Sequence, residues 1–479
     1  MCIPPTVVAA LARKQPQLGS FHFTTEINCV GPYQNGCKVL DFTPFRNIRS
    51  IYWHYPPWYQ NMPAFLGLLE NNPSLLEELE LDNYSWRTLM QSFGQCRHGV
   101  PPEEQLFGAL PIVPNTGEPC SAPSFPSLRV LTLSSVKLGY IGAEDLFKRL
   151  NPAILQSLTL RSCDGWERFL TLLVESGALV QLRTLEITDD SGDWAVGPIL
   201  EGVEGLENLY LSLWTTYSHM TGLPEFRLWP AIARHGKTLK RVVFHQRNPH
   251  TRIDCFDSPL DMGDEEEQEA TNPMEALSNL ECLGLSNDPE ASSFVSTLPS
   301  PFHQSPYLSL TKQSTNLFTS SQRLLLHPFT NSTTLRLLHI RQTVTDRMTH
   351  PNRQPLVLIP EDTTRWESTP GTLPDEVLQS SLTPLFRDLV DWAFSPQGIK
   401  SLQVIAWGDF AFGYKGWRTG YNLFVCRDKR DKQGWRVYDA RDKRFEGEWK
   451  GLLVGGREDW RFLEAGPLGS EFGNWGVVP

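Results

Sequence analysis

The sequence lacks the cysteine pattern, the long apolar runs and the basic excess that mark three large classes of protein. Its nine cysteines include no C-x-x-C pair, which argues against zinc-binding and thioredoxin-like sites. No stretch approaches the roughly 18 consecutive apolar residues of a membrane-spanning helix. A net charge of −11 argues against a general binder of nucleic acids or anionic membranes. We therefore expect neither nucleic acid nor a membrane as partner.

The motifs of common enzymes are missing as well. The sequence contains no glycine-rich nucleotide-binding string, no G-x-S-x-G and no H-E-x-x-H. It therefore predicts no enzyme, with no catalytic residues, cofactor or metal. Cys163 is expected to be a buried structural residue, and Asp189 and Asp190 to cap a turn or a helix. The alternative that stays open is an enzyme with a site in the irregular C-terminal region.

The first residues, Met1–Pro5, contain no basic region leading into an apolar core, so they do not resemble a signal peptide. Nine scattered cysteines in 479 residues also do not suggest a disulfide framework. Both features favour a reducing compartment, and we expect a cytoplasmic or nuclear protein.

What the sequence does contain is a repeat. Its clearest unit, Leu155-x-x-Leu158-x-Leu160-x-x-Cys163, fits the L-x-x-L-x-L-x-x-N/C pattern of leucine-rich repeats. Of the first six steps between successive units, five lie between 24 and 30 residues, and later steps are longer. Eleven units carry the pattern or bulky substitutes, and they begin at Leu18, Ile48, Leu76, Leu128, Leu155, Leu182, Leu206, Leu239, Leu280, Leu335 and Leu402.

The pattern predicts one short strand in each unit. Positions 4 and 6 face inward, whereas positions 3, 5 and 7 face the other way. Apolar residues at helical spacing predict helices between the strands, as in Ala143–Leu150, Trp166–Leu173 and Val7–Leu18. The predicted fold is α/β, a leucine-rich-repeat solenoid over residues 1–409 with a curved parallel sheet and outer helices.

Four insertions interrupt this array, near residues 94–126, 247–275, 287–334 and 343–381. The second contains the acidic run Asp261–Glu269, which is either a solvated loop or an attractor for a basic partner. A short strand is conceivable at Leu356–Ile359, and Leu382–Phe394 has the broad apolar face of a helix.

The last part of the chain, residues 410–479, is rich in tryptophan and is expected to cap the open end of the array. Asn422–Arg427 and Gly434–Tyr438 are predicted to be two strands joined by a charged turn. Aromatic and basic residues together also suit nucleic-acid stacking, but neighbouring carboxylates cancel the positive charge here.

The outward positions of the strands form the candidate protein-binding face. Tyr52 and Tyr210 are expected to be aromatic anchors on a concave face that runs from an acidic to a basic end. Polar residues also occur on any solvated sheet face, which is the alternative for each residue taken singly. The candidate residues are Tyr52, His54, Glu78, Glu80, Asp82, Arg161, Glu186, Tyr210, Arg241, His245, His339 and Arg341.

Three segments near the C-terminus carry a resemblance to a known family: Leu389–Pro396, Leu402–Phe410 and Tyr421–Arg427. Together they resemble the C-terminal part of a fungal group of F-box and leucine-rich-repeat proteins. The resemblance implies the substrate-recognition part of an F-box-type ubiquitin ligase adaptor, whose partners are a ubiquitination substrate and a cullin–RING adaptor. Val7–Leu18 already has the pattern of a repeat helix, and no Leu-Pro-x-Glu-like F-box opening is visible. The alternative is a free-standing scaffold without a ligase role.

Overall fold

The computed structural model forms an α/β structure in which strands and helices alternate along the chain. It divides into two compact units, one made mainly of residues 1–190 and 194–206 and the other mainly of residues 207–467. The structure describes residues 5–24, 42–54, 65, 67–82, 124–136, 138–178, 181–189, 196–214, 228–248, 253–255, 273–286, 323, 325–341, 375–408, 410, 422–439, 453 and 457–465. Within these residues, every helix is too short or too polar to cross a bilayer.

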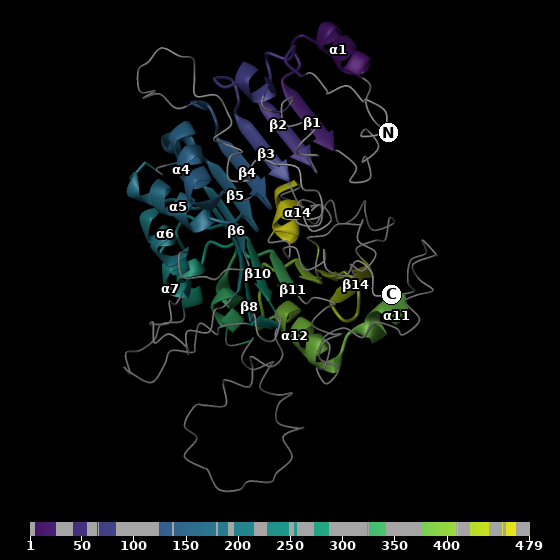
Figure 1. The fold of residues 1–479 in the computed structure, drawn as a ribbon. Coiled ribbons are helices and arrows are strands. Elements are labelled where there is room, and N and C mark those ends of the chain that lie inside the picture. The colour runs from purple at the N-terminus through teal and green to yellow at the C-terminus, as the bar shows by residue number, and fades with distance from the viewer. Residues whose placement is uncertain are drawn as a thin grey trace, which may run out of the picture. The chain divides into compact units, whose positions relative to one another are not determined.

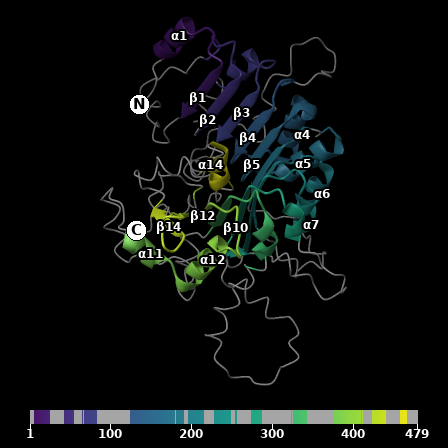
Figure 2. The ribbon, with the colours of Figure 1, turned by 180° about the vertical axis from the view of Figure 1, so that it is seen from behind.

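The first unit is built on a parallel sheet whose strands pair in chain order. Seen from behind in Figure 2, β1 to β5 lie side by side in that order. Pairing without a shift in register continues from β5 to β6. The six strands are β1 (Ser20–Thr24), β2 (Ser50–His54), β3 (Glu78–Asp82), β4 (Val130–Ser134), β5 (Ser157–Arg161) and β6 (Thr184–Asp189).

One hydrogen-bond arrangement recurs before most of the parallel strands. The carbonyl of the second residue of a leucine-rich repeat accepts hydrogen bonds from two backbone N–H groups of the following repeat. The carbonyl of Arg49, for example, accepts from Glu77 (2.7 Å) and Glu78 (3.0 Å). The same arrangement occurs in the second unit, where Lys240 accepts from Glu281 (2.7 Å) and Cys282 (3.1 Å). Because neighbouring repeats within each compact unit are bonded in the same way, the sequence repeat is also a structural repeat.

Helices cover one side of the first unit. Figure 1 shows α4 (Gly139–Arg149), α5 (Trp166–Glu175) and α6 (Val196–Gly202) next to one another beside the strands, and adjacent helices are in contact. The buried residues of α5 are spaced as one helix face: Trp166, Phe169, Leu170 and Leu173. This unit also contains α1 (Pro5–Lys14) and the 3-10 turn η3 (Pro152–Ile154), and residues 67–71 are helical.

A glycine fixes the start of α5. Gly165 has φ of 81°, and a Cβ placed there would lie 2.7 Å from the carbonyl oxygen of Gly139. Both the backbone conformation and the close approach of α4 therefore require glycine at this position.

The buried side-chain amide of Asn72 links two neighbouring repeats of the first unit. The side chain of Asn72 accepts a hydrogen bond from the N–H of Ile48 (2.9 Å) and donates to the carbonyls of Phe45 (2.8 Å) and Leu68 (2.8 Å). These backbone groups lie where the chain turns between β1, β2 and β3, so the amide supplies partners that the sheet does not.

The second unit continues the same plan with longer connections. Its parallel strands pair in chain order and in register, apart from β9, which pairs antiparallel with β8. The strands are β7 (Asn208–Trp214), β8 (Arg241–Asn248), β9 (Ile253–Cys255), β10 (Cys282–Ser286), β11 (Leu337–Arg341) and β12 (Val404–Trp407). Its helical elements are α7 (Leu228–Ala233), η5 (Pro273–Leu277), η7 (His327–Asn331), α11 (Asp375–Ser381), α12 (Pro384–Phe394) and α14 (Arg457–Glu464).

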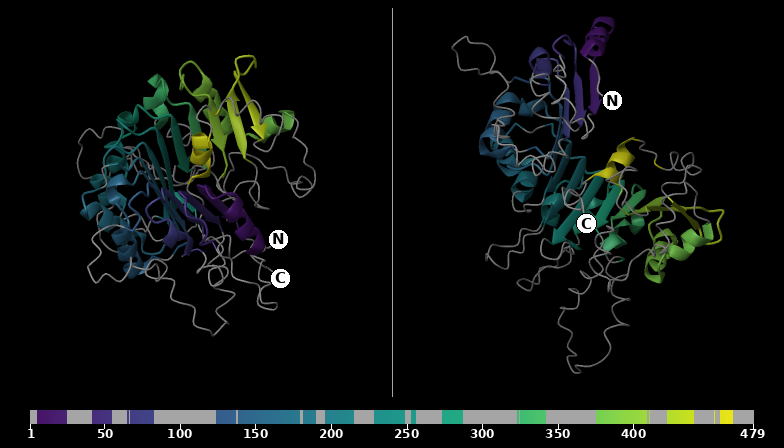
Figure 3. Two further views of the ribbon diagram at one scale, coloured as in Figure 1. Left: turned by 90° about the horizontal axis from the view of Figure 1, so that it is seen from above. Right: turned by 45° about the vertical axis from the view of Figure 1, so that its right-hand side comes forward.

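An antiparallel hairpin extends this sheet beyond β12. Strands β13 (Leu423–Arg427) and β14 (Trp435–Asp439) pair with each other, and β13 pairs antiparallel with β12. Arg427 links the hairpin to the end of α12 and to the segment after it. Its guanidinium donates hydrogen bonds to the carbonyls of Phe394, Ile399 and Leu402 at 2.8–2.9 Å. Figure 3 shows the hairpin and α12 as neighbouring elements.

Many of the sequence predictions are confirmed. Each of the eleven units contains a strand at the predicted positions, the helices at Ala143–Leu150, Trp166–Leu173 and Leu382–Phe394 are present, and the two C-terminal strands form. The acidic run Asp261–Glu269 and the segment Leu356–Ile359 lie outside the described residues, as does most of the four predicted insertions. The predicted change of character at residue 410 lies within the second unit.

Candidate functional site

The strand face of the first unit carries three rows of polar side chains across the sheet. The register aligns His22, Tyr52, Glu80, Thr132, Thr159 and Glu186 in one row. The rows on either side begin at Ser20 and Thr24, and Val130 is the one apolar member among the three. The intervening rows are apolar and form the core, with Leu79, Leu131 and Leu158 almost fully buried. Strand alternation thus separates a core side from a polar side.

The polar side is most exposed on β1–β3. His22 is exposed, and Tyr52, Glu78, Glu80 and Asp82 are half-buried. We call these five residues the acidic strand face. On β4–β6 the side chains at the equivalent positions are less exposed, and Thr132, Thr159 and Thr188 are buried. The side chain of the predicted site residue His54 lies outside the described residues.

Contacts between side chains of neighbouring strands fix the positions of residues on this surface. The ring of Tyr52 stacks on that of His22 with centroids 4.0 Å apart, and its hydroxyl bonds to the carboxylate of Glu78. A stacked and hydrogen-bonded aromatic ring loses little conformational freedom on binding, which suits a contact surface. The sequence predicted Tyr52 as an anchor, whereas it gave no role to His22.

Arg161 and Glu186 form a bidentate ion pair on β5 and β6. The guanidinium Nε and Nη2 donate to the two carboxylate oxygens at 2.7 and 3.1 Å. The Glu186 side chain is fully buried and that of Arg161 is 26% exposed. Burial acts to lower the pKa of Arg161, but the charge of Glu186, its hydrogen bond and the charges of Glu80 and Asp82 together raise that pKa above its ordinary value. Both predicted residues are therefore engaged with each other, and Glu186 is closed to a partner.

In the second unit the equivalents of two of these rows become largely apolar. The row through Tyr210 continues with Val243, Gly284, His339 and Ala406. The row through Asn208 and Arg241 continues with Cys282, Leu337 and Val404. These side chains, Asn208 and Arg241 apart, belong to a buried region that includes Phe462 and Leu463 of α14.

Four predicted binding residues are consequently buried. Tyr210 is 0% exposed, and His245, His339 and Arg341 are each 1% exposed. Inside, Arg341 Nη1 lies 2.8 Å from His245 Nδ1, and His339 Nε2 lies 2.9 Å from the carbonyl oxygen of Gly408. The expectation that these side chains stand on an open concave face is wrong, because they pack inside the second unit.

The predicted basic end of the face is also absent. Arg241 is only 11% exposed and lies 3.7 Å from both Glu281 and Asp459. Arg341 is buried, so neither cation is presented at the surface. Of the predicted charge gradient, only the acidic part remains exposed among the described residues.

Sequence reasoning missed the residues that cover this face, which include Phe462 and Leu463 of α14 and, outside that helix, Phe410 and Leu453. A signal was present, because apolar residues at positions 3 and 5 of several units require a cover: Val243, Cys282, Leu337, Val404 and Ala406. The pattern of the short segment Arg457–Glu464 alone does not reveal which strands it contacts.

The described residues include histidine, cysteine and carboxylate side chains, the groups that bind metal ions or act as nucleophiles. They contain no group of three or more histidine, cysteine, aspartate or glutamate side chains that could hold a metal ion. Cys163 is buried as predicted, with its Sγ 3.3 Å from the carbonyl oxygen of Leu133. Burial raises the pKa of the Cys282 thiol to about 12, which disfavours the thiolate form that a nucleophile needs.

Comparison with protein-family models and with curated proteins finds no match for this chain.

Proposed function

We propose that this chain is a leucine-rich-repeat protein that binds a protein partner through the acidic strand face of its first unit. The repeat assignment is supported by the leucine pattern and by the hydrogen-bond arrangement that recurs from unit to unit. The acidic strand face lies on a rigid parallel sheet, which presents side chains in fixed positions.

The observation that carries the binding role is the concentration of acidic and aromatic side chains on β1–β3. Glu78, Glu80 and Asp82 project from the polar side of β3, next to the stacked rings of His22 and Tyr52. Aromatic residues are common at the energetic centre of protein interfaces, and carboxylates select partners of opposite charge. We infer that the partner presents lysine or arginine residues to this face.

A charge-reversal experiment tests this proposal. The variant Glu78→Lys/Glu80→Lys changes the acidic strand face, and Glu175→Lys/Glu201→Lys makes the same change in charge at exposed positions on α5 and α6. Tagged full-length proteins are purified from their native cells, and co-purifying proteins are quantified by mass spectrometry. We expect one or more proteins to be lost with the first variant and retained with the second. Identical partners for wild type and both variants would contradict the proposal.

The same purification separates the two partner classes that the sequence leaves open. A ubiquitin ligase subunit should bring down a cullin–RING adaptor together with its substrate, whereas a free-standing scaffold should not. A known F-box protein purified in parallel shows whether the conditions preserve the adaptor complex. We expect adaptor binding to survive Glu78→Lys/Glu80→Lys, because substrate recognition and adaptor docking use separate surfaces in such proteins.

A further inference from the structure

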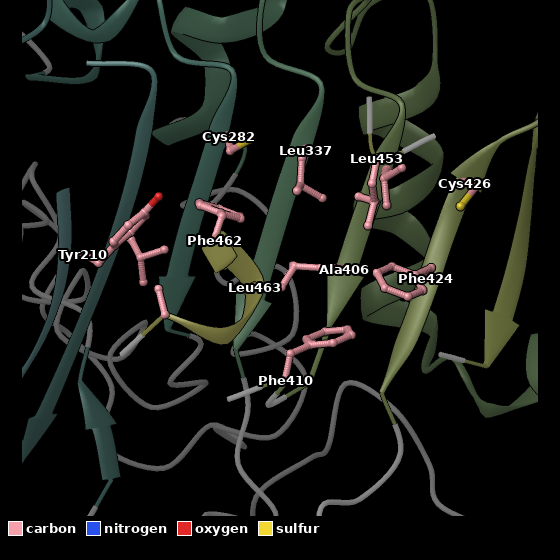
Figure 4. Close-up of a cluster of buried hydrophobic side chains, with 13 residues drawn as sticks. Tyr210, Cys282, Leu337, Ala406, Phe410, Phe424, Cys426, Leu453, Phe462 and Leu463 are labelled. Carbon is pink, nitrogen blue, oxygen red and sulfur yellow. The ribbon is translucent and has the colours of Figure 1, made fainter. Parts of the chain in front are cut away.

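The short helix α14 packs on the strand side of the second unit. Figure 4 shows Phe462 and Leu463 of α14 lying against strands that carry Tyr210, Cys282 and Leu337. The ring of Phe462 lies 6.4 Å from that of Tyr210 and 6.2 Å from that of His339, measured between centroids. Residues from four strands thus meet one turn of a helix far away in the sequence.

A glycine on β10 makes room for this packing. A Cβ at Gly284 would lie 3.4 Å from Cζ of Phe462 and 2.9 Å from Cγ2 of Val243. Every other described strand of the repeat carries a side chain at this position. The Phe462 ring therefore packs directly over the glycine, and a side chain longer than a Cβ at this position would collide with it.

A carboxylate forms the polar half of the contact. Asp459, which is 0% exposed, forms a bidentate pair with the guanidinium of Arg336 and lies 3.7 Å from Arg241 Nη2. Burial acts to lower the pKa of Arg336, but its hydrogen bonds to Asp459 and the surrounding negative charges together raise that pKa above its ordinary value. Both arginines also lie within 3.5–3.7 Å of Glu281, on the strand side. They therefore keep one carboxylate partner if α14 leaves.

Helix α14 owes its structure to this surface. It has only eight residues, and an isolated helix shorter than about 12 residues is marginal in water. Its buried residues, Asp459, Phe462 and Leu463, all contribute to the contact described above. The relation of α14 to the strands is that of a short amphipathic helix bound in a groove.

We propose that the strand face of β7, β8, β10 and β11 is a helix-binding surface, and that α14 is its exchangeable intramolecular ligand. The outside partner that fits the surface is an amphipathic helix with an acidic residue followed by two apolar residues three and four positions later, as in Asp459, Phe462 and Leu463. Such a helix would place its carboxylate on Arg336 and Arg241 and an aromatic ring over Gly284.

Opening of α14 would create the two features that a partner helix needs. It exposes adjacent apolar positions on neighbouring strands, and exposed apolar patches with a polar rim mark protein-binding sites. It also frees one side of Arg336 and Arg241, which favours an acidic helix over a basic one. This surface is separate from the acidic strand face, so the two proposals can fail independently.

The first test asks whether α14 opens on its own. Asp459→Asn removes one charge from the contact, and Glu458→Gln is the matched control at the exposed neighbouring position. Cys282 lies under the helix, with its Sγ 3.9 Å from Asp459, so its alkylation rate reports opening. Cys163, buried in the first unit, serves as the internal reference. Peptide-resolved mass spectrometry measures both thiols, together with amide hydrogen exchange of the helix and the strands.

We expect Asp459→Asn to speed alkylation of Cys282 about 10- to 100-fold, the factor that follows from losing a charged hydrogen bond. The amides of α14 should exchange correspondingly faster, while those of β10 and β11 and the thiol of Cys163 stay unchanged. Glu458→Gln should behave as wild type. If the strands lose protection together with α14, or if both variants behave alike, α14 is an integral part of the core and the proposal is wrong.

The second test asks whether the ligand can be exchanged. A fluorescent peptide of residues 456–466 is titrated into full-length wild type and full-length Asp459→Asn, and fluorescence anisotropy is measured. We expect at least tenfold tighter binding to the variant, because in wild type the attached helix competes at about millimolar effective concentration. A peptide with Phe462→Ala should bind at least tenfold more weakly. Equal or absent binding of the native peptide to a variant shown to be open would overturn the exchange.

Discussion

Replacement of the buried amide Asn72 should destabilise the first unit strongly. The Asn72→Ala variant loses three hydrogen bonds at once, those to the N–H of Ile48 and the carbonyls of Phe45 and Leu68. Each bond contributes about 0.5–1.5 kcal/mol net, and a buried N–H without a partner costs about 1–3 kcal/mol. Asn72 is 0% exposed, so water does not readily replace the amide. We expect a loss of about 2–4 kcal/mol in the free energy of unfolding.

The neighbouring residue provides a matched control. Asn71 also donates to a carbonyl four residues earlier, that of Gly67 at 2.7 Å, but it is half-buried and makes this one bond. Asn71→Ala should therefore cost less than about 1 kcal/mol. Asn72→Asp should be no better than Asn72→Ala, because its carboxylate can accept from Ile48 but cannot donate to two carbonyls.

Thermal unfolding of the full-length protein, followed by circular dichroism, measures the effect. For a cooperative unit of about 200 residues, 2–4 kcal/mol corresponds to roughly 4–16 °C in the midpoint of its transition. Hydrogen exchange of residues 48–54 assigns the loss to the first unit. Equal stability of Asn72→Ala and Asn71→Ala would refute the reasoning. The loss of three buried hydrogen bonds would then cost no more free energy of unfolding than the loss of one half-buried bond.

Four further changes follow from the same kind of argument. Arg427→Lys should cost about 1–3 kcal/mol in chemical denaturation, because a single ammonium cannot reach the three carbonyls that the guanidinium spans; no loss would mean that these bonds are not formed. Arg161→Ala should cost about 3–5 kcal/mol by leaving the buried Glu186 carboxylate without its bidentate partner, and the double variant with Glu186→Gln should recover part of this. Gly165→Ala should destabilise α5 by more than about 1 kcal/mol, measured as faster amide exchange in that helix, since φ of 81° and the backbone of α4 both oppose a Cβ. The free energy of unfolding should fall as pH rises from about 9 to about 12, by up to about 1.4 kcal/mol per pH unit. In the unfolded chain the Cys282 thiol has its ordinary pKa of 9.0, whereas burial raises that pKa to about 12 in the folded chain. Comparing the pH dependence of wild type with that of Cys282→Ala isolates this contribution, and identical slopes would contradict it.

The leucine pattern alone determined the eleven repeat strands of this protein. Apolar residues at positions 4 and 6 of each unit have to face inward on a short strand, and this predicted the strands from Ser20–Thr24 to Val404–Trp407. The helical spacing of Trp166, Phe169 and Leu173 likewise predicted α5. These features are local, since each depends on residues within one unit, and local patterns can be read from a sequence.

Tertiary structure decides which of the outward-facing side chains are exposed to solvent and which are buried. Tyr52 and Tyr210 occupy the same position in their units, yet Tyr52 is half-exposed and Tyr210 is fully buried. The difference arises because α14, about 250 residues further along the chain, packs on the strands of the second unit. Its contact includes the Phe462 ring over Gly284 and the Arg336–Asp459 pair, and both join residues far apart in the sequence. The sequence thus determined which side chains face away from the core, and only the folded chain decided which of them meet solvent.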